Sequence, residues 1–560
     1  MNKHAMQHIM DSAYCFPIGE KEITIRFRTA KGDVQKVWIV FENKYVIGQT
    51  QQKLPMEKKY SGELFDYYSV TLKPEDTRLA YVFYLYDGER YYYFSEDGLS
   101  TEYDFSVGFY NFFQYPYINS ADVLRQVEWT KDAVFYQIFV DRFFMGDMSA
   151  DKSYVNCKWG EKPTPKSFAG GDLKGVLEKL DYIKNLGANT IYLTPIFTSK
   201  SNHKYDISDY YQIDKHFGEN EDLHRLIDAA HKKGMRIVLD AVFNHCSEEL
   251  AQFQDVVKKG RASEYYDWFV IYGEKPEKKK ANYEMFASCA YMPKFNTSNE
   301  EVQKYLIDIA CHYIDVYHID GWRLDVSDEV SHDFWRLFRK EVKKHNPECV
   351  ILGENWHDAG NYLRGDQYDG IMNYAFTKAC LDFFAWGKMD AQQMSDKLSD
   401  ILMRNTDTVN RMMLNLLDSH DTHRFYTEVG MDTQRVHAAL ALLYLFPGMP
   451  CVYYGTETLM QGGYDPDCRR CMDWEGIEKG QYQETISYLQ MLGRLRETYA
   501  LSKAETKLEA QDGVFVLRRL TNGNEIVLYI NVQDKEAVAD GRKMAPQSHE
   551  LIVNGGKVCE

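Results

Sequence analysis

The run Gly321-Trp322-Arg323-Leu324-Asp325-Val326 is apolar except for one cation and one carboxylate. Its length and its apolar residues are typical of a buried β-strand. Side chains alternate between the two faces of a strand, so Arg323 and Asp325 should point to the same side and could share a site. Because an Arg and an Asp two residues apart more often form a surface ion pair, this interpretation needs support from the rest of the chain.

That support comes from seven further runs of the same kind between residues 133 and 454. They are Ala133 to Val140, Asn189 to Pro195, Arg236 to Val242, Val350 to Asn355, Gly370 to Phe376, Met412 to Ser419 and Met449 to Tyr454. Helical patterns lie between them; Asp172 to Leu186, for example, repeats apolar residues at helical spacing and is followed by Gly187. Eight strands separated by helices predict a (β/α)₈ barrel.

The segments on either side of the barrel have β patterns. Ile23 to Phe27 and Val37 to Phe41 are short and rich in β-branched and aromatic residues, and Asn522-Gly523 is a hairpin turn in the tail. We therefore predict a multidomain α/β protein with an N-terminal β-sandwich and a C-terminal β domain. The expected ranges are 1–127 for the sandwich, 128–503 for the barrel, about 245–299 for a domain inserted after strand three, and 504–560 for the C-terminal domain.

Composition narrows the class of partner. The formal charge of −17 argues against nucleic acid and against anionic membranes, and it suits an enzyme that acts on a neutral substrate. No stretch approaches the roughly 20 apolar residues that a membrane span needs, and we expect no secretion signal at the start. The eleven cysteines are odd in number and scattered, which favours reduced thiols in the cytoplasm.

Polar residues gather where four of the predicted strands end. Three carboxylates, Asp325, Glu354 and Asp421, close the fourth, fifth and seventh strands. The carboxyl ends of barrel strands share one rim, so these three side chains should converge. Asp240, His245, Arg323 and His420 lie beside them in sequence or on neighbouring strands. Clustered like charges are costly unless a site uses them, so the pattern indicates an active site.

These strand-end segments resemble, in order and spacing, the signature segments of the α-amylase superfamily of glycoside hydrolases. Two further stretches are similar to the branch of neopullulanases, cyclomaltodextrinases and maltogenic amylases: Met292-Pro293-Lys294-Phe295-Asn296 and Gly462-Gly463-Tyr464-Asp465-Pro466-Asp467-Cys468-Arg469-Arg470. The resemblance implies hydrolysis of α-1,4 and also α-1,6 glucosidic bonds of cyclodextrins, pullulan and short malto-oligosaccharides, with retention of configuration. It implies no organic cofactor, and it implies that the N-terminal sandwich is similar to a starch-binding module.

The same resemblance implies the roles of the carboxylates. Asp325 would be the nucleophile, Glu354 the general acid and base, and Asp421 the stabiliser of the transition state. The residue types agree, because cleavage needs one protonated carboxyl group for the leaving oxygen and one ionised carboxylate for the sugar carbon. The implied substrate-binding residues are Tyr205, Asp240, His245, Arg323, Glu329, Trp356, His420, Asp465 and Arg469.

A calcium site is also implied, in the loop after the first strand. Its ligands would be Asp147, Asp151, Gly170 and Asp172. Met145 and Ala150 stand where the family has oxygen-bearing side chains, and calcium takes six to eight oxygens. A bound ion and its absence therefore both stay open.

Two alternatives share parts of this pattern. A transglycosylase of the same superfamily would have the same catalytic residues, and the sequence Val326-Ser327-Asp328-Glu329 departs from the Val-Ala-Asn-Glu usual in the branch. A non-catalytic binding or scaffold protein could use the same barrel but would not need all three carboxylates. The resemblance further implies a homodimer, because branch members lay the sandwich over the partner's barrel mouth; aromatic residues between 109 and 117 fit such an interface.

Overall fold

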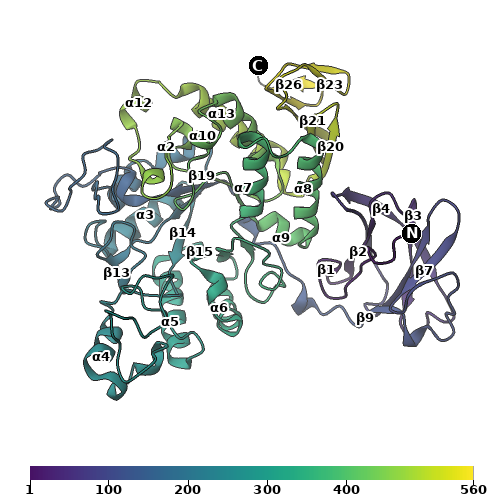
Figure 1. Ribbon diagram of the computed structural model, residues 1–560, viewed down its shortest axis with the longest axis horizontal. Helices are drawn as coiled ribbons and strands as arrows, with labels where there is room; N and C mark the ends of the chain where they lie inside the picture. Colours follow the sequence, from purple (N-terminus) through teal and green to yellow (C-terminus); the bar gives the residue numbers. More distant parts are fainter. Residues whose placement is uncertain (559–560) are drawn as a thin grey trace.

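The computed structural model describes residues 1–558, so the last two residues of the predicted C-terminal domain lie outside it. Figure 1 shows a central barrel, a separate lobe of N-terminal strands in purple, and the C-terminal strands in yellow along another edge. This arrangement confirms the predicted multidomain α/β architecture. The boundaries that we placed at residues 127 and 503 stay predictions. Within residues 1–558, no helix combines the length and the apolar character needed to cross a bilayer.

The N-terminal lobe is a sandwich of antiparallel strands between residues 15 and 115. The strands are β1 (Cys15–Gly19), β2 (Glu22–Ala30), β3 (Lys36–Asn43), β4 (Gln52–Ser61), β5 (Phe65–Leu72), β6 (Leu79–Tyr86), β7 (Tyr91–Ser95), β8 (Gly98–Ser100) and β9 (Phe113–Tyr115). Strand β4 belongs to both layers, because its first half pairs with β3 and its second half with β5. Buried side chains such as Phe27, Ile39 and Phe83 fill the space between the layers.

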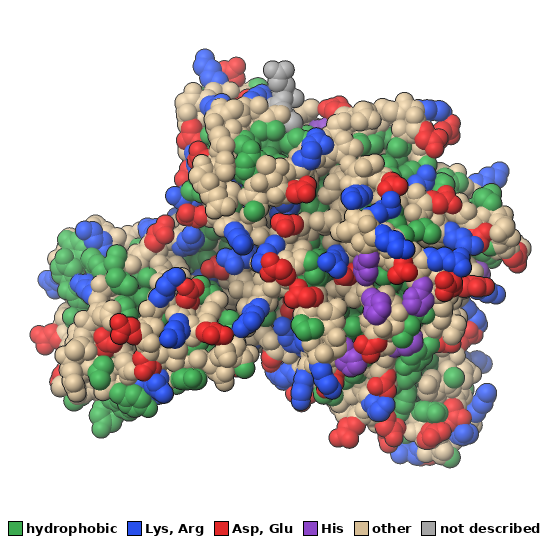
Figure 2. All heavy atoms as spheres, turned by 180° about the vertical axis from the view of Figure 1, so that it is seen from behind, with side chains coloured by type: hydrophobic (Ala, Val, Ile, Leu, Met, Phe, Trp, Pro, Cys, Tyr) green, Lys and Arg blue, Asp and Glu red, His purple; other side chains and the backbone are tan. Residues whose placement is uncertain are grey.

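The aromatic residues between 109 and 117 divide into two groups. Phe112, Phe113 and Tyr115 are buried. Phe109, Tyr110 and Tyr117 are 62%, 89% and 55% exposed, so only half of these rings could contact a partner. Figure 2, which views the molecule from behind, shows hydrophobic side chains gathered at the outer end of the N-terminal lobe, while acidic and basic side chains are interspersed over the rest of the visible surface.

The barrel consists of parallel strands between residues 135 and 453. They are β10 (Phe135–Ile138), β11 (Thr190–Leu193), β14 (Arg236–Ala241), β15 (Gly321–Leu324), β16 (Val350–Gly353), β17 (Gly370–Ile371), β18 (Leu414–Leu416) and β19 (Met449–Tyr453). The order β17-β16-β15-β14-β11-β10-β19-β18 is closed by a bridge between Met372 and Leu414. Inward side chains such as Tyr192, Val238 and Leu352 fill the interior, as a packed barrel requires.

Helices surround this barrel. They are α1 (Leu173–Glu178), α2 (Leu180–Asn185), α3 (Asn220–Lys232), α4 (Ala251–Lys259), α5 (Glu300–Tyr317), α6 (His332–His345), α7 (Tyr374–Cys380), α8 (Ala391–Met403), α9 (Asp407–Met412), α10 (Phe425–Glu428), α11 (Thr433–Leu445), α12 (Trp474–Glu478) and α13 (Gln483–Tyr499). The helix expected from Asp172 to Leu186 is present as α1 and α2, with a break at Lys179.

The predicted sixth strand was too long. We expected a strand from Gly370 to Phe376, but β17 ends at Ile371 and α7 begins at Tyr374. The side chain of Asn373 accepts a hydrogen bond from the Phe376 amide, so it caps the helix where the sequence pattern had suggested more strand. Apolar runs of this length do not distinguish a strand from a buried helix start.

Two further features complete the fold. The segment inserted after β14 contains α4 and bridges from His245 to Lys294 and from Phe269 to Phe295, so it stands beside the strand ends. The tail forms a sheet in the order β20-β21-β22-β25-β26. Its strands are β20 (Glu505–Gln511), β21 (Val514–Thr521), β22 (Asn524–Asn531), β25 (Ser548–Val553) and β26 (Gly556–Lys557), beside a hairpin of β23 (Ala537–Ala539) and β24 (Arg542–Met544).

The sandwich is attached to the barrel by buried polar contacts. Arg26, which is 1% exposed, binds Asp407 at 2.6 Å and the Asn405 carbonyl at 2.7 Å. The Tyr60 hydroxyl donates to the Thr506 carbonyl at 3.2 Å, which ties the sandwich to the C-terminal sheet as well. Removing residues 1–127 would therefore break polar contacts with two other parts of the molecule.

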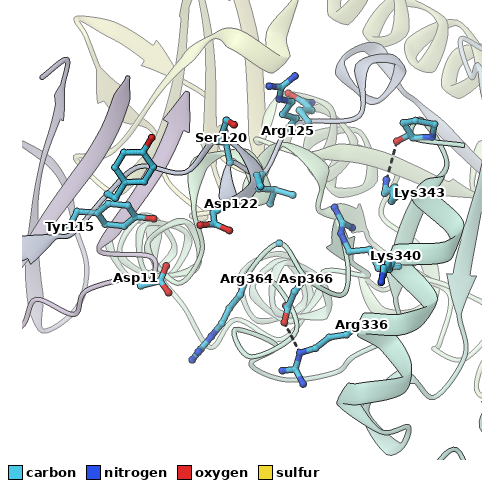
Figure 3. A pocket seen from close by; sticks show the side chains of 18 of the residues that line it. Asp11, Tyr115, Ser120, Asp122, Arg125, Arg336, Lys340, Lys343, Arg364 and Asp366 are labelled. Atoms are coloured by element: carbon cyan, nitrogen blue, oxygen red, sulfur yellow. Dashed lines mark hydrogen bonds and ion pairs between the residues drawn. The ribbon is translucent and has the colours of Figure 1, made fainter. Parts of the chain in front are cut away.

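A cavity of about 1400 Å³ lies between the sandwich and the barrel. In Figure 3, Asp11 and Tyr115 face it from the sandwich, and Arg336, Lys340 and Lys343 face it from α6. None of Asp325, Glu354 and Asp421 is among its lining residues, so this cavity is separate from the strand-end cluster.

Candidate active site

A second cavity, of about 520 Å³, opens at the carboxyl ends of the barrel strands. Nine of the twelve residues predicted as catalytic or substrate-binding line it: Tyr205, His245, Asp325, Glu329, Glu354, Trp356, Asp421, Asp465 and Arg469. The other three, Asp240, Arg323 and His420, are buried and contact the lining residues directly. The structure therefore brings the predicted site residues together.

Arg323 joins the carboxylates at the centre of the site. Its side chain is 1% exposed on strand β15. Nη1 lies 2.7 Å from Oδ1 of Asp325 and 3.0 Å from Oδ1 of Asp240, and Nη2 forms an ion pair with Oε2 of Glu354 at 3.0 Å. The Nη2 contact is an ion pair only, because its geometry does not meet the criteria for a hydrogen bond. One guanidinium thus holds three carboxylates in fixed positions, which a planar fork of donors can do.

Asp325 has one oxygen engaged and one free. Oδ1 accepts from Arg323, whereas Oδ2 is buried without a hydrogen-bond partner among residues 1–558. Burial raises the pKa of Asp325 well above its ordinary value; the Arg323 cation opposes this shift, and the charges of Glu354 and Asp240 add to it. The free oxygen is therefore available to a ligand in the cavity, and the positive charge of Arg323 is what favours its ionised form.

The backbone after Asp325 is strained. Val326 has φ 44°, in the left-handed region that β-branched residues avoid. In this conformation the Val326 amide donates to Oε2 of Glu354 at 2.9 Å. A single strained residue thus connects the two carboxylates, and strain of this kind is found mainly at functional sites.

Glu354 is held on its other side by an aromatic pair. The Trp356 indole donates to Oε1 at 3.2 Å, and its ring stacks on Tyr374 at 3.7 Å between centroids. Trp356 is 48% exposed and lines the cavity. It therefore both orients the carboxyl group and presents a flat surface toward the place of a ligand.

Asp421 and Arg469 form the opposite wall. Arg469 Nη2 lies 3.3 Å from Oδ1 of Asp421, and Nη1 lies 3.0 Å from Oδ1 of Asp465. Nε of Arg469 also donates to the His420 carbonyl at 2.9 Å. This arginine therefore fixes the loop after β18 against the segment that contains Asp465.

His420 is a neutral hydrogen-bonding group. Burial lowers its pKa well below the ordinary value, and the cations Arg469 and Arg323 lower it further. The Gln137 amide lies 2.7 Å from Nδ1, which places the proton on Nε2. Nε2 faces the Tyr205 hydroxyl and, at 3.1 Å, Oδ2 of Asp421.

Tyr205 and Asp240 form a layer beneath the cavity. The Tyr205 hydroxyl donates to Oδ2 of Asp240 at 3.0 Å, and the Tyr192 hydroxyl donates to the same oxygen at 2.6 Å. The Tyr205 ring lies parallel to the His420 ring. Burial raises the pKa of Asp240 to about 6, against the Arg323 cation and the Tyr192 hydroxyl, which lower it. Asp240 is thus held by hydrogen bonds as well as by charge.

His245 offers an unused nitrogen. Its Nε2 is buried without a hydrogen-bond partner in the described part of the chain, and its ring stacks on Phe286 at 4.7 Å. Burial lowers the pKa of His245 to about 3, so the ring is neutral near pH 7. A neutral imidazole at a cavity wall can donate to or accept from a sugar hydroxyl.

Several residues of the site were not predicted. Gln137, Tyr192 and Tyr374 orient His420, Asp240 and Trp356, and the cavity lining also includes His203, Phe286, Cys289, Tyr291, Met292, Val326 and Asp328. His203 precedes Tyr205 by two residues, and Gln137 and Tyr192 lie in the first two barrel strands, so strand-end position could have identified them. Phe286, Cys289 and Tyr291 come from the part of the inserted segment after α4, which forms no helix or strand.

Two of the four residues implied as calcium ligands contact the same lysine. Nζ of Lys152 lies 2.8 Å from Oδ2 of Asp172 and 3.0 Å from the Gly170 carbonyl. Asp147 pairs with Lys174, and Asp151 is exposed and accepts from the Ser153 amide. Across residues 1–558, no group of three or more His, Cys, Asp or Glu side chains is arranged to hold a metal ion. These residues as arranged do not fit calcium.

Comparisons with known proteins agree with this geometry. Residues 137–526 match the family described as alpha amylase, catalytic domain, and residues 1–119 match the alpha amylase, N-terminal ig-like domain. A cyclomaltodextrinase of Thermoanaerobacter pseudethanolicus is 45% identical over 96% of this chain and 94% of its own length. Neopullulanase 2 of Thermoactinomyces vulgaris is 42% identical over 89% of this chain and 84% of its own.

A solved structure named cyclomaltodextrinase has a TM-score of 0.91 and 38% identity, covering 96% of this chain and 92% of that one. It extends over the sandwich, the barrel and most of the tail, so the similarity is not confined to the barrel. The chain therefore belongs to the α-amylase family of glycoside hydrolases, in the branch that includes cyclomaltodextrinases and neopullulanases.

Proposed function

We propose that this enzyme hydrolyses α-1,4 and α-1,6 glucosidic bonds of cyclodextrins, pullulan and short malto-oligosaccharides, with retention of anomeric configuration. The observation that carries the proposal is the position of Arg323, which holds Asp325 and Glu354 at one cavity that Asp421 also lines. Relatives named cyclomaltodextrinase and neopullulanase support the substrate class. A non-catalytic binding protein would not need this arrangement of three carboxylates.

The first step is cleavage of the glycosidic bond. Glu354 donates a proton to the glycosidic oxygen, and the free Oδ2 of Asp325 attacks the anomeric carbon. The leaving sugar departs with the proton, and a glycosyl ester forms on Asp325. Arg323 stabilises the negative charge of Asp325 before attack, and Asp421 binds sugar hydroxyls while positive charge develops on the ring.

The second step hydrolyses the glycosyl ester and regenerates the free enzyme. Glu354, now ionised, removes a proton from water, and the resulting nucleophile attacks the anomeric carbon from the side that the leaving group vacated. The ester bond to Asp325 breaks, and the product keeps its original configuration. Two inversions at one carbon account for retention.

The remaining cavity residues bind and orient the sugar. Tyr205 offers a ring face, and His245 and His420 offer neutral nitrogens. Arg469 and Asp465 close one wall, and Trp356 offers an exposed indole beside Glu354. Flat aromatic faces and neutral hydrogen-bonding groups suit an uncharged oligosaccharide.

Transglycosylation is a second activity that one observation favours. Near the catalytic carboxylates, Glu329 pairs with Lys294 at 2.7 Å, and Asp328 pairs with His357 at 3.3 Å. Both acidic residues line the cavity and could hold the hydroxyls of an acceptor sugar in place of water. Incubation with γ-cyclodextrin, with and without added glucose, separates the two activities by whether longer or α-1,6-linked products form.

Product analysis tests the main proposal. The enzyme should release maltose and glucose from γ-cyclodextrin and short products from pullulan, and NMR of the first products should show the α-anomer. Asp325→Asn serves as the control for contaminating activity. Initial formation of the β-anomer, or products that also form with Asp325→Asn, would contradict the assignment.

We also propose that the enzyme forms a homodimer through the sandwich. The exposed rings of Phe109 and Tyr110 support this, because aromatic side chains are enriched at interfaces. The double change Phe109→Ser with Tyr110→Ser should lower the mass measured by light scattering to that of one chain and raise activity on starch relative to γ-cyclodextrin. The matched control is Val538→Ser, which removes an exposed apolar residue from the C-terminal domain. A double variant with unchanged mass would refute this interface.

A cytoplasmic location and the three-domain division complete the proposal. All ten cysteines that the structure describes are free, and nine of them are buried. This supports a reducing compartment, where thiols stay unpaired.

The division at residues 127 and 503 is supported by the change from antiparallel strands to parallel strands and back.

A further inference from the structure

We propose that the ammonium group of Lys152 replaces a calcium ion in the loop after β10, so that this loop is ordered by a cation of the chain itself. The proposal concerns residues 144–172 and does not depend on the reaction assigned above. It follows from the arrangement of the residues that the family resemblance implied as calcium ligands.

Lys152 contacts two of the four implied calcium ligands. Its Nζ lies 2.8 Å from Oδ2 of Asp172 and 3.0 Å from the Gly170 carbonyl, and its side chain is 18% exposed. An ammonium has three donors, and two of them are thus directed at oxygens implied as metal ligands. A divalent cation bound to the same two oxygens would meet strong repulsion from this charge.

Asp172 has little capacity left for a metal. Its Oδ1 accepts from the Gly175 amide at 2.8 Å and the Gly146 amide at 3.1 Å. Its Oδ2 accepts from the Asp147 amide at 3.0 Å as well as from Lys152. Asp172 is also the N-cap of α1, so these bonds fix the loop to the helix.

The remaining implied ligands are directed elsewhere. Asp147 pairs with Lys174 and accepts from the Ser149 amide at 3.0 Å. Asp151 is exposed and accepts from the Ser153 amide at 2.8 Å. Calcium takes six to eight oxygens, and two positions nearby, Met145 and Ala150, supply no side-chain oxygen.

The loop that Lys152 orders is connected to the active site. Gly170 lies three residues after Ser167, whose carbonyl accepts from Arg142 and, at 2.8 Å, from the Asn202 amide. Nη1 of Arg142 donates in turn to the carbonyl of Arg469 at 2.9 Å, and Arg469 holds Asp421. A cation at Lys152 therefore supports a wall of the cavity without touching a ligand in it.

Calcium dependence of the full-length protein tests this inference. The protein is dialysed against EGTA, its calcium content is measured by mass spectrometry, and its thermal midpoint is measured with EGTA and with millimolar CaCl₂. We expect well under one calcium per chain and the same midpoint in both conditions. One calcium per chain that resists dialysis, or a midpoint several degrees higher with calcium, would overturn the proposal.

A lysine substitution gives the complementary test. Lys152→Met should lower the thermal midpoint by several degrees, because it leaves Asp172 and the Gly170 carbonyl without their cation. The matched control Lys158→Met changes an exposed lysine of the same loop and should leave the midpoint unchanged. An equal midpoint for Lys152→Met and Lys158→Met would refute the role of Lys152. If Lys152→Met does not fold, Lys152→Arg replaces it and should keep most of the stability, while Lys152→Gln should not.

Discussion

Replacing Arg323 by lysine tests the central feature of the site. The guanidinium reaches Asp240 and Asp325 with one nitrogen and Glu354 with the other, at 2.7–3.0 Å. A lysine keeps one positive charge but has a single nitrogen on a flexible stem, so it cannot keep all three contacts. At least one contact between charged groups is lost, which costs about 1.5–3 kcal/mol.

Because the contact also stabilises the transition state, the expected effect is a loss of about 10- to 150-fold in kcat/KM. The acid limb of the pH profile should move to higher pH as well. Burial raises the pKa of Asp325, and Arg323 opposes that shift, so a weaker cation lets the pKa rise further and a higher pH is needed to ionise the nucleophile.

The assay is kcat/KM on γ-cyclodextrin between pH 4 and 8, with thermal unfolding of each variant. The matched control is Arg339→Lys, because Arg339 makes a comparable ion pair with Asp369 at 2.8 Å on the far side of the barrel from the cavity. It should lower stability and leave the pH profile unchanged. The reasoning would be refuted if Arg323→Lys kept more than half of kcat/KM, or if its acid limb moved to lower pH.

Three further predictions concern single residues. Asp325→Asn should bind cyclodextrin yet lose about a thousandfold or more in kcat, because an amide cannot form the ester; a variant with a tenth of the normal rate would exclude Asp325 as nucleophile. Glu354→Gln should lose far more activity on maltotriose than on an aryl maltoside with a good leaving group, which needs little protonation; equal losses would exclude the acid role. Asp369→Asn should lower the free energy of unfolding at pH 7 by about 3 kcal/mol, because it breaks buried pairs with Arg339 and Lys343. Burial alone would raise the pKa of Asp369, but these two cations hold it below its ordinary value, so the stabilisation exists above the pKa of an unfolded aspartate and disappears as the pH falls through the folded pKa. Urea unfolding at pH 7 and at low pH should therefore show that the difference in the free energy of unfolding between Asp369→Asn and the parent becomes smaller as the pH falls. A difference that does not change with pH would contradict the linkage.

The sequence predicted the barrel because buried parallel strands have a distinctive pattern. Gly321 to Val326 and Arg236 to Val242 are mostly apolar and carry an aspartate near their carboxyl ends, Asp325 and Asp240, so both the strand and its functional end could be located. The sixth strand was predicted incorrectly, since only Gly370–Ile371 is strand and the following residues start a helix. A short apolar run does not show whether a strand or a helix will form.

The site was predictable where it lies on strands and was missed where it depends on packing. Asp325 and Glu354 directly follow β15 and β16, and Asp421 lies in the loop after β18, so their convergence follows from the barrel. Phe286 and Tyr291 reach the cavity from the inserted segment, and only tertiary contacts such as the bridge from His245 to Lys294 bring them there. The place of Lys152 could not be predicted either, because nothing in sequence shows which way a lysine in an irregular loop turns.

The left-handed conformation of Val326 has a consequence for how activity and folding are related. A β-branched residue at φ 44° does not adopt this geometry by its own preference; holding it there costs on the order of 1–3 kcal/mol, which the closed barrel around it must supply. The alignment of Asp325 with Glu354 is thus a property of the whole barrel rather than of the segment that contains them. We therefore expect this peptide to relax when heat or denaturant first loosens the barrel, before the strands separate. Turnover should then be lost at a lower temperature than helical circular dichroism, and coincident losses would contradict this expectation.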